Sequence, residues 1–131
     1  MMKFLLIDDS AFSRKISANY IRKYFPDASI EFASDGEMGI QKFDQTHPDY
    51  VIADLLMPKV SGKDMISILK KKNFHNIIVL SADVQKGIRQ EIEAMGITAF
   101  INKPLSDETM QVLYAKIKGT RRFALAPAEM T

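Results

Sequence analysis

Three aspartates in this chain directly follow apolar runs. Asp8 and Asp9 follow the run 2–7, and Asp54 follows the run 50–53. If these runs are neighbouring parallel strands, the carboxylates meet at the carboxyl edge of one sheet, where open α/β folds bind ligands. Converging carboxylates repel each other unless a cation lies between them. Mg²⁺ suits such a site because it takes few protein oxygens and keeps several waters.

Two further polar groups follow the other apolar runs. Ser81 follows the run 77–80, and Lys103 follows the run 99–102. An ammonium can bind phosphate oxygens, and a hydroxyl adds a hydrogen-bond donor. Phosphoryl transfer needs mostly positioning and neutralisation of charge. We therefore expect Asp54, which the other functional strands flank, to be the nucleophile that accepts a phosphoryl group, with Ser81 and Lys103 as catalytic partners.

The apolar runs alternate with segments of helical period, which predicts a parallel sheet with crossover helices. Ser10 and Ser106 are expected to begin the first and last helices, and Gly96 to end the fourth, which spans about 84–95. The expected inner faces are Phe12, Ile16, Tyr20 and Tyr24; Ile40 and Phe43; Met65, Ile66 and Leu69; Ile88 and Ile92; and Met110, Leu113, Tyr114 and Ile117.

The 131 residues are enough for one domain of five βα units. We place this domain at 2–118, and residues 119–131 form either a helix extension or a disordered tail. The chain has no cysteine, which excludes disulfides and thiolate metal sites and fits a cytoplasmic location. No apolar run is long enough to span a membrane. The basic clusters at 70–72 and 116–122 are interpreted as solvated helix faces, so no direct nucleic-acid partner is expected.

Taken in order, these motifs resemble the receiver domain of two-component response regulators over about residues 2–118. The matching motifs are Asp8-Asp9, then Asp54 followed by Leu55-Leu56-Met57-Pro58 and Gly62, then Ser81-Ala82, and finally Lys103-Pro104. The resemblance implies a flavodoxin-like (βα)5 fold with strand order 2-1-3-4-5. Because no output domain fits in the remaining residues, the chain is most similar to the stand-alone, CheY-like members.

The resemblance also implies a role for each site residue. Asp54 would be phosphorylated, Asp9 would bind Mg²⁺ directly, and Asp8 would bind it through water. The backbone carbonyl of Leu56 would complete the protein ligands, and Ser81 and Lys103 would bind the phosphoryl oxygens. Phe100 would be the switch aromatic that turns inward when Ser81 moves.

Residues beside the acceptor are expected to modulate the lifetime of the phosphoryl group. Leu56 and Asp83 should crowd the path of an attacking water, which Asp83 can orient and Leu56 cannot. Ala82 is small and should leave the site open to a donor or a phosphatase.

The expected partners are a sensor histidine kinase or a histidine phosphotransfer protein as donor, and a downstream target protein, with a phosphatase as a further candidate. No membrane partner is expected. The output surface would be helix 4, strand 5 and helix 5. The chain would be a signalling switch that catalyses only its own phosphorylation and slow dephosphorylation.

Other interpretations of the same residues exist. A cofactor enzyme of flavodoxin type would need donors that cradle a phosphate after the first strand, where Asp8 and Asp9 stand instead. A receiver-like interaction module that works without phosphorylation stays open. Taken singly, the aspartate pair could be a helix cap, Ser81 a capping hydroxyl, Lys103 a surface lysine and Phe100 a core aromatic.

Overall fold

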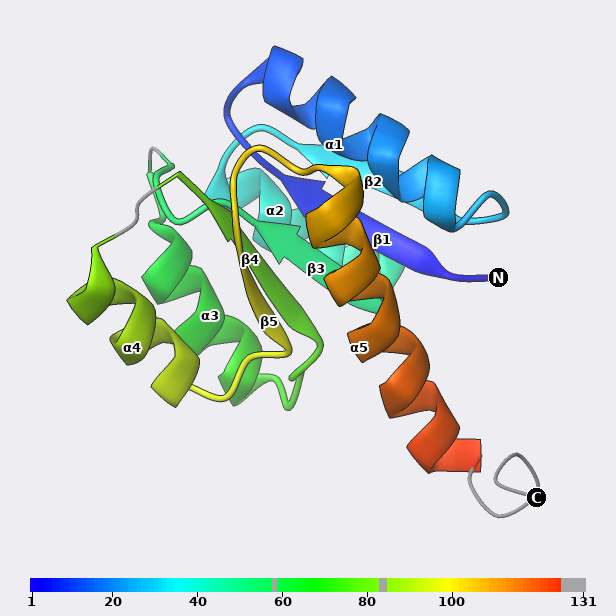
Figure 1. Cartoon of the computed structure of the whole chain (residues 1–131). Helices are drawn as coiled ribbons and strands as arrows, with labels where there is room; N and C mark the ends of the chain where they lie inside the picture. Colours follow the sequence, from blue (N-terminus) through cyan, green and yellow to red (C-terminus); the bar gives the residue numbers. More distant parts are fainter. Residues whose placement is uncertain (58, 83–84, 126–131) are drawn as a thin grey trace.

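The computed structural model describes residues 1–57, 59–82 and 85–125. Over these residues strands and helices alternate (Figure 1). The strands are β1 (Lys3–Ile7), β2 (Ser29–Ala33), β3 (Tyr50–Ala53), β4 (Ile77–Ser81) and β5 (Ala99–Asn102). The helices are α1 (Ala11–Tyr24), α2 (Gly36–Thr46), α3 (Gly62–Lys71), α4 (Lys86–Ala94) and α5 (Asp107–Leu125).

The strands form one parallel sheet in the order β2-β1-β3-β4-β5, as predicted. The chain moves outward from β1 to β2 and then returns past β1 to β3. The strand order therefore reverses between β1 and β3, and the crevice at such a reversal is the usual ligand site of open α/β sheets.

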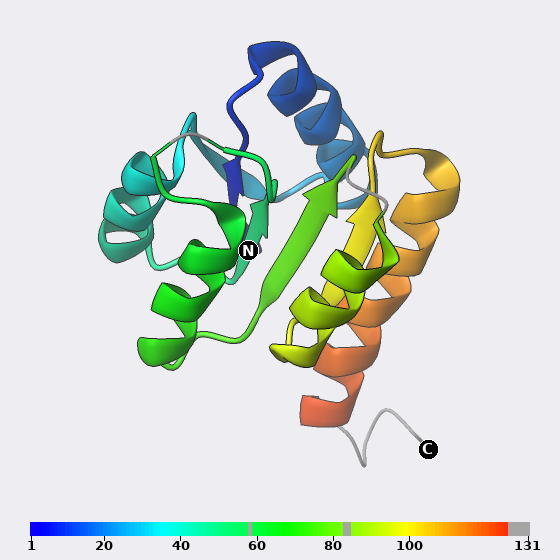
Figure 2. The same ribbon diagram turned by 90° about the vertical axis from the view of Figure 1, so that its left-hand side faces the viewer.

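Helices cover both faces of the sheet, which explains why the strands are apolar along their whole length. Alternate residues of a strand point to opposite faces, so Phe4 and Leu6 pack with α1 and α5, whereas Leu5 and Ile7 pack on the other face. Helices α2, α3 and α4 cover that second face (Figure 2). Within the described residues, no helix is both long enough and apolar enough to cross a membrane.

Most helix boundaries follow from local capping. The Ser10 side chain accepts a hydrogen bond from the Ser13 amide, and Asp35 and Ser61 begin α2 and α3 in the same way. Gly96 has φ of 81° beyond the end of α4, the left-handed conformation that glycine adopts at no steric cost. Helix α4 differs from the three capped helices because its N-cap residue, Gln85, makes no side-chain cap hydrogen bond.

The inner face expected for α1 was wrong at Phe12, whereas Tyr20 is partly buried against the core. The helix buries Ser17, Ala18 and Ile21, and the Phe12 side chain is 73% exposed. Helix α1 packs against both β1 and α5, so small side chains face inward and allow close approach, while the aromatic residues of the same helix lie at the edge. The predicted inner faces of α3 and α5 are confirmed, with Met65, Leu69, Met110 and the other residues of those stripes buried or partly buried.

The structure also shows where the fourth helix begins and where the fifth helix ends. Helix α4 begins at Lys86, two residues after the predicted start at about 84. Residue 84 itself lies outside the described residues. Helix α5 continues to Leu125, so residues 119–125 extend the helix beyond the body of the sheet (Figure 1). Residues 126–131, the rest of the predicted tail, lie outside the described residues.

Candidate phosphoacceptor site

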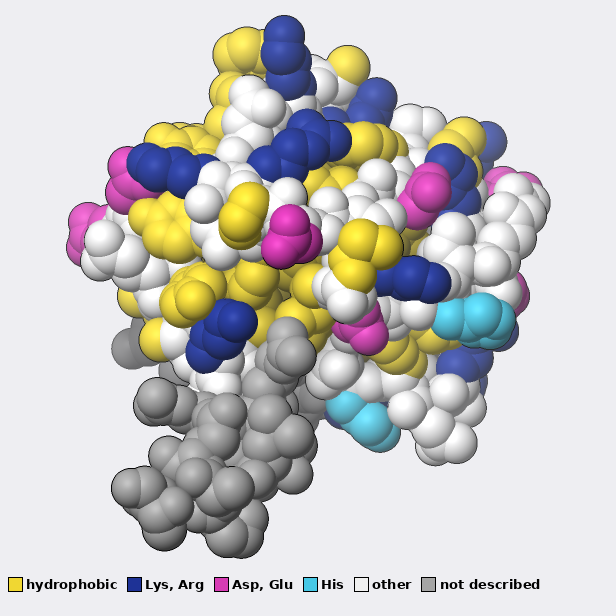
Figure 3. Space-filling model, turned by 90° about the vertical axis from the view of Figure 1, so that its right-hand side faces the viewer, with side chains coloured by type: hydrophobic (Ala, Val, Ile, Leu, Met, Phe, Trp, Pro, Cys, Tyr) yellow, Lys and Arg dark blue, Asp and Glu magenta, His cyan; other side chains and the backbone are white. Residues whose placement is uncertain are grey.

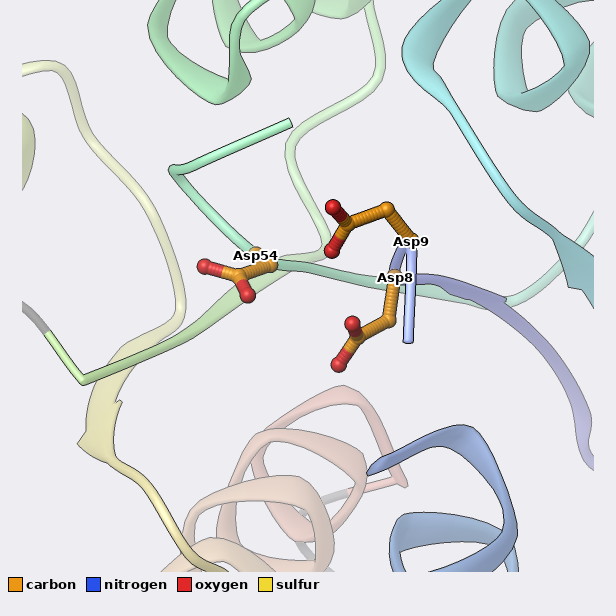
Figure 4. A group of neighbouring side chains, drawn as sticks. All are labelled: Asp8, Asp9 and Asp54. Carbon is orange, nitrogen blue, oxygen red and sulfur yellow. The ribbon is translucent and has the colours of Figure 1, made fainter. Parts of the chain in front are cut away.

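The three aspartates of the sequence motif lie together at the carboxyl edge of the sheet. Asp8 and Asp9 leave the end of β1, and Asp54 leaves the end of β3 (Figure 4). These strands are neighbours on either side of the reversal in strand order. One carboxylate oxygen from each aspartate lies within 4.8 Å of the others. Asp8 and Asp54 are buried, and Asp9 is exposed.

Lys103 connects two of these carboxylates. Its Nζ donates to Asp8 Oδ2 at 2.6 Å and to Asp54 Oδ2 at 2.8 Å. The side chain reaches them from the loop after β5, whose course is set by hydrogen bonding of the Lys103 amide to the Ser81 carbonyl, at 2.9 Å. Burial alone would lower the pKa of Lys103, but the hydrogen bonds to Asp54 and Asp8 raise it above its ordinary value. The ammonium therefore stays charged between the two acids.

Asp8 is held on both of its carboxylate oxygens. Besides Lys103, Oδ2 accepts a hydrogen bond from Ser13 Oγ at 2.7 Å, and Oδ1 accepts one from the Ser10 amide at 3.0 Å. Burial raises the pKa of Asp8, but the hydrogen bonds from Lys103, Ser13 and Ser10 outweigh that effect and leave the pKa below its ordinary value. Asp8 is consequently ionised and fixed in orientation at neutral pH.

Asp54 is 8% exposed and also accepts two hydrogen bonds. Oδ1 accepts a hydrogen bond from the Leu56 amide at 3.1 Å, and Oδ2 accepts one from Lys103 Nζ. The loop behind it is packed closely, because a Cβ at Gly62 would lie 2.7 Å from the Asp54 carbonyl oxygen and 2.6 Å from Leu55 Cα. Glycine at the start of α3 thus lets the helix approach the loop that carries the acceptor.

The site is chemically suited to Mg²⁺. It offers oxygen donors, and among the described residues three carboxylates lie around the Lys103 ammonium, which leaves a local excess of negative charge. Lys103, Ser13 and Ser10 donate to the oxygens of Asp8, and the water-mediated metal contact expected for this residue stays a prediction. Asp9 is the exposed member. The part expected for the Leu56 carbonyl stays a prediction.

The two expected switch residues lie on neighbouring strands. Ser81 is fully buried at the end of β4, and in the sheet register it pairs with Asn102, two residues beyond Phe100. The Phe100 ring is already buried, at 4% exposure, on the face that α4 covers. The guanidinium of Arg89, from α4, lies 5.1 Å from the ring centroid, and Arg89 Nη2 donates to the Phe100 carbonyl at 3.4 Å.

Of the three modulating positions, the structure describes two. The Leu56 side chain is 61% exposed beside the acceptor, and Ala82 is exposed beyond β4. Asp83 lies outside the described residues. The exposed leucine gives the rim of the site an apolar component on the β3 side.

An apolar hollow lies on the other side of the acceptor. It has a volume of about 270 Å³ and opens between α1 and the loop after β5. Figure 3 shows the opposite side of the molecule, away from the hollow, where hydrophobic side chains lie among charged ones. The hollow is lined by Phe12, Ser13, Ile16, Ala82, Pro104 and Leu105, among others, and Lys103 also borders it. A partner protein seated here would therefore lie next to the acceptor.

Sequence reasoning missed Ser13, Arg14 and Arg89. Ser13 donates to the Asp8 side chain, and Arg14 Nη1 donates to the Asp8 backbone carbonyl at 2.6 Å. The spacing of Ser10 and Ser13 places both hydroxyls in the first turn of the helix that follows Asp8, and this was the available signal. Nothing comparable indicated Arg89, because its contact with Phe100 depends on how α4 lies on the sheet.

Comparisons with known proteins agree with this geometry. The family model of the response regulator receiver domain matches residues 4–115. The chemotaxis protein CheY of Listeria monocytogenes is 30% identical over 118 residues, which cover 86% of this chain and 96% of that protein. A protein-glutamate methylesterase/protein-glutamine glutaminase of Koribacter versatilis is 32% identical over 128 residues, 89% of this chain and 34% of that protein. The chain thus spans about a third of that methylesterase relative.

Solved structures share the fold. The response regulator domain of Thermotoga maritima CheB has a TM-score of 0.75 at 28% identity, over 97% of this chain and 98% of the other. The chemotaxis response regulator CheY4 of Vibrio cholerae has a TM-score of 0.73 at 26% identity, over 93% and 98%. Family match, topology and the arrangement of acids around a lysine lead to one conclusion. This chain belongs to the response regulator receiver domain family of two-component signalling.

Proposed function

We propose that this receiver domain accepts a phosphoryl group on Asp54 from a phosphohistidine of a sensor histidine kinase or a histidine phosphotransfer protein. An Asp54 carboxylate oxygen forms a bond to phosphorus while the phosphorus–nitrogen bond of the donor breaks and the imidazole leaves. The observation that carries the proposal is the Lys103 ammonium held between the carboxylates of Asp8 and Asp54.

Each residue has a part that its position supports. Lys103 and the Ser81 hydroxyl would bind phosphoryl oxygens once Asp54 is modified. Asp8 and Asp9 would hold Mg²⁺ together with Asp54, and Mg²⁺ would supply positive charge that neutralises the phosphoryl oxygens. The Leu56 amide, which donates to Asp54 Oδ1, keeps the carboxylate from rotating, so that Oδ2 stays beside Lys103.

The donor is proposed to dock over the apolar hollow beside the acceptor. Phe12 and Ile16 on α1 and Pro104 after β5 form much of its wall. A helix that carries the donor histidine could bury apolar side chains there and at the same time bring its phosphoryl group to Asp54. Phe12, a large apolar side chain exposed on this rim, is the residue that a docked partner would cover.

The output is proposed to leave through Ser81, Phe100 and α4. Phosphorylation would add acceptor oxygens that draw the Ser81 hydroxyl toward Asp54. Because the Phe100 ring is already buried, we propose that the change repositions the ring under Arg89 and does not bury an exposed ring. Helix α4 suits such movement, since Gln85 does not cap it with its side chain and Ile92 is the residue of α4 that the core fully buries among those described. The downstream target would bind this face, and a phosphatase would reach the phosphoryl group through the open site beside Ala82.

The alternative function, binding partners without phosphorylation, predicts a different result in one experiment. The wild-type chain is incubated with Mg²⁺ and acetyl phosphate or phosphoramidate, and the intact mass is measured. We expect the mass of one added phosphoryl group. Loss of this mass in acid and its absence from Asp54→Asn would assign the group to Asp54. Asp27→Asn, at an exposed aspartate on the turn after α1, is the matched control. Wild-type chain that gains no mass would contradict phosphoacceptor function and favour the alternative.

A further inference from the structure

Ser13 contacts the metal site although its role in the proposed function is unassigned. Its Oγ donates to Asp8 Oδ2 at 2.7 Å from the first turn of α1. Within the part of the chain that the structure describes, the Asp8 carboxylate receives two other donors, the Ser10 amide and the Lys103 ammonium. Ser13 is partly buried and borders the apolar hollow.

These three donors differ in what else they must do. Lys103 is shared with Asp54 and, in the proposed function, moves to phosphoryl oxygens when Asp54 is modified. The Ser10 amide reaches only Oδ1. Among the described donors, Ser13 is therefore the side chain that holds Asp8 Oδ2 both before and after phosphoryl transfer.

The first turn of α1 is built to keep this contact. The Ser10 side chain caps the helix by accepting the Ser13 amide at 3.1 Å, which fixes the Ser13 backbone. Arg14 Nη1 donates to the Asp8 carbonyl at 2.6 Å, which holds the end of β1 against the same turn. Two consecutive residues of α1 thus hold Asp8: Ser13 contacts its side chain, and Arg14 contacts its backbone carbonyl.

We propose that Ser13 is a positioning residue for the Mg²⁺ site. The inference rests on the proposed function, because it assumes that Asp8 serves the metal. A terminal carboxylate torsion is broad and roughly two-fold, so a hydrogen bond to one oxygen selects a single orientation. Partners of this kind orient metal ligands, and their removal typically lowers metal affinity 10- to 100-fold.

If Ser13 had no role at the site, its replacement by alanine would leave Mg²⁺ binding unchanged. Alanine has a higher helix propensity than serine, so a serine without a role at the site would be replaced by alanine with no loss of stability and no change in Mg²⁺ binding. The positioning role predicts a folded Ser13→Ala protein that binds Mg²⁺ more weakly.

The test is a Mg²⁺ titration followed by amide NMR at Asp9 and Leu56, for the wild type and three variants. Ser13→Ala is expected to weaken Mg²⁺ binding about tenfold. Ser13→Thr keeps the hydroxyl at a position that borders the hollow, so it should bind as the wild type does. Ser17→Ala removes a buried hydroxyl one turn later on the same helix and serves as the matched control. Thermal unfolding of each variant confirms that it is folded.

The outcomes separate the two proposals. Wild-type chain that does not bind Mg²⁺ would refute the proposed function, and this inference with it. Wild-type binding with an equal affinity for Ser13→Ala would overturn the positioning role and leave the proposed function standing. Equal losses in Ser13→Ala and Ser17→Ala, or a loss in Ser13→Thr as large as in Ser13→Ala, would attribute the effect to the helix and would also overturn it.

Discussion

Replacing Lys103 by methionine tests whether its charge holds the acidic site together. Methionine keeps an unbranched apolar stem but removes the ammonium that lies 2.6 Å from Asp8 Oδ2 and 2.8 Å from Asp54 Oδ2. Two buried carboxylates would then lack their cation. Removing one partner of a buried ion pair typically costs about 3–5 kcal/mol of unfolding free energy.

Protonation limits this loss. A carboxyl that is too unfavourable in its charged form can take up a proton, and at pH 7 this costs roughly 4 kcal/mol because each pKa unit is worth about 1.4 kcal/mol. Lys103 is also slightly exposed, with 17% of its side-chain area accessible. We therefore expect Lys103→Met to lower the free energy of unfolding by about 3 kcal/mol at pH 7.

The pH dependence identifies the cause. In the wild type, the pKa of Asp8 is lowered below 3.8, so its contribution to stability is present above that value and is lost as pH falls through the folded pKa. In Lys103→Met the hydrogen bond and charge that lower this pKa are gone, and burial raises it. The deficit of the variant should thus be largest near pH 7 and shrink as pH falls toward about 4.

The assay is urea unfolding followed by circular dichroism at pH 7 and pH 4.5, with EDTA or with Mg²⁺. Mg²⁺ should stabilise Lys103→Met more than the wild type, because no ammonium then repels the ion and tighter binding to the folded state adds stability. Lys23→Met, at the exposed ion pair with Asp107, should change stability little and show no dependence on Mg²⁺. A deficit in Lys103→Met that is equal at both pH values and insensitive to Mg²⁺ would mean that packing, and not charge, explains the loss.

Three further predictions concern metal, switch and partner. Asp9→Ala should weaken Mg²⁺ binding more than Asp8→Ala in a calorimetric titration, since Asp8 is occupied by protein donors; equal losses would contradict this division. Ser81→Ala should still accept phosphate but lose the beryllofluoride-induced amide shifts around Phe100 and α4; wild-type shifts there would argue against the coupling. Phe12→Ala should slow phosphorylation by a cognate kinase and leave acetyl phosphate labelling unchanged, so an equal slowing with both donors would exclude a docking role.

The sequence alone determined the order of the elements and the edge at which the chemistry lies. Runs such as 50–53 and 77–80 are apolar along their whole length, which is the pattern of strands covered on both faces. Their alternation with helical periods leaves a parallel sheet as the arrangement that buries them all. Once the strands are parallel, the polar residue after each one must lie at the same edge, so the sequence alone predicts that Asp8, Asp54 and Lys103 lie together.

Only the tertiary structure decided how each side chain is turned and what it contacts. The apolar stripe of α1 suggested an inner face that includes Phe12, but packing against both β1 and α5 rotated the helix so that Ser17 and Ala18 face inward. The same rotation places Ser13 on Asp8, and the position of α4 places Arg89 over Phe100. Such contacts depend on the angle and rotation at which one element packs on another. The periodicity of a segment predicts that it is a helix, but it does not determine how that helix packs.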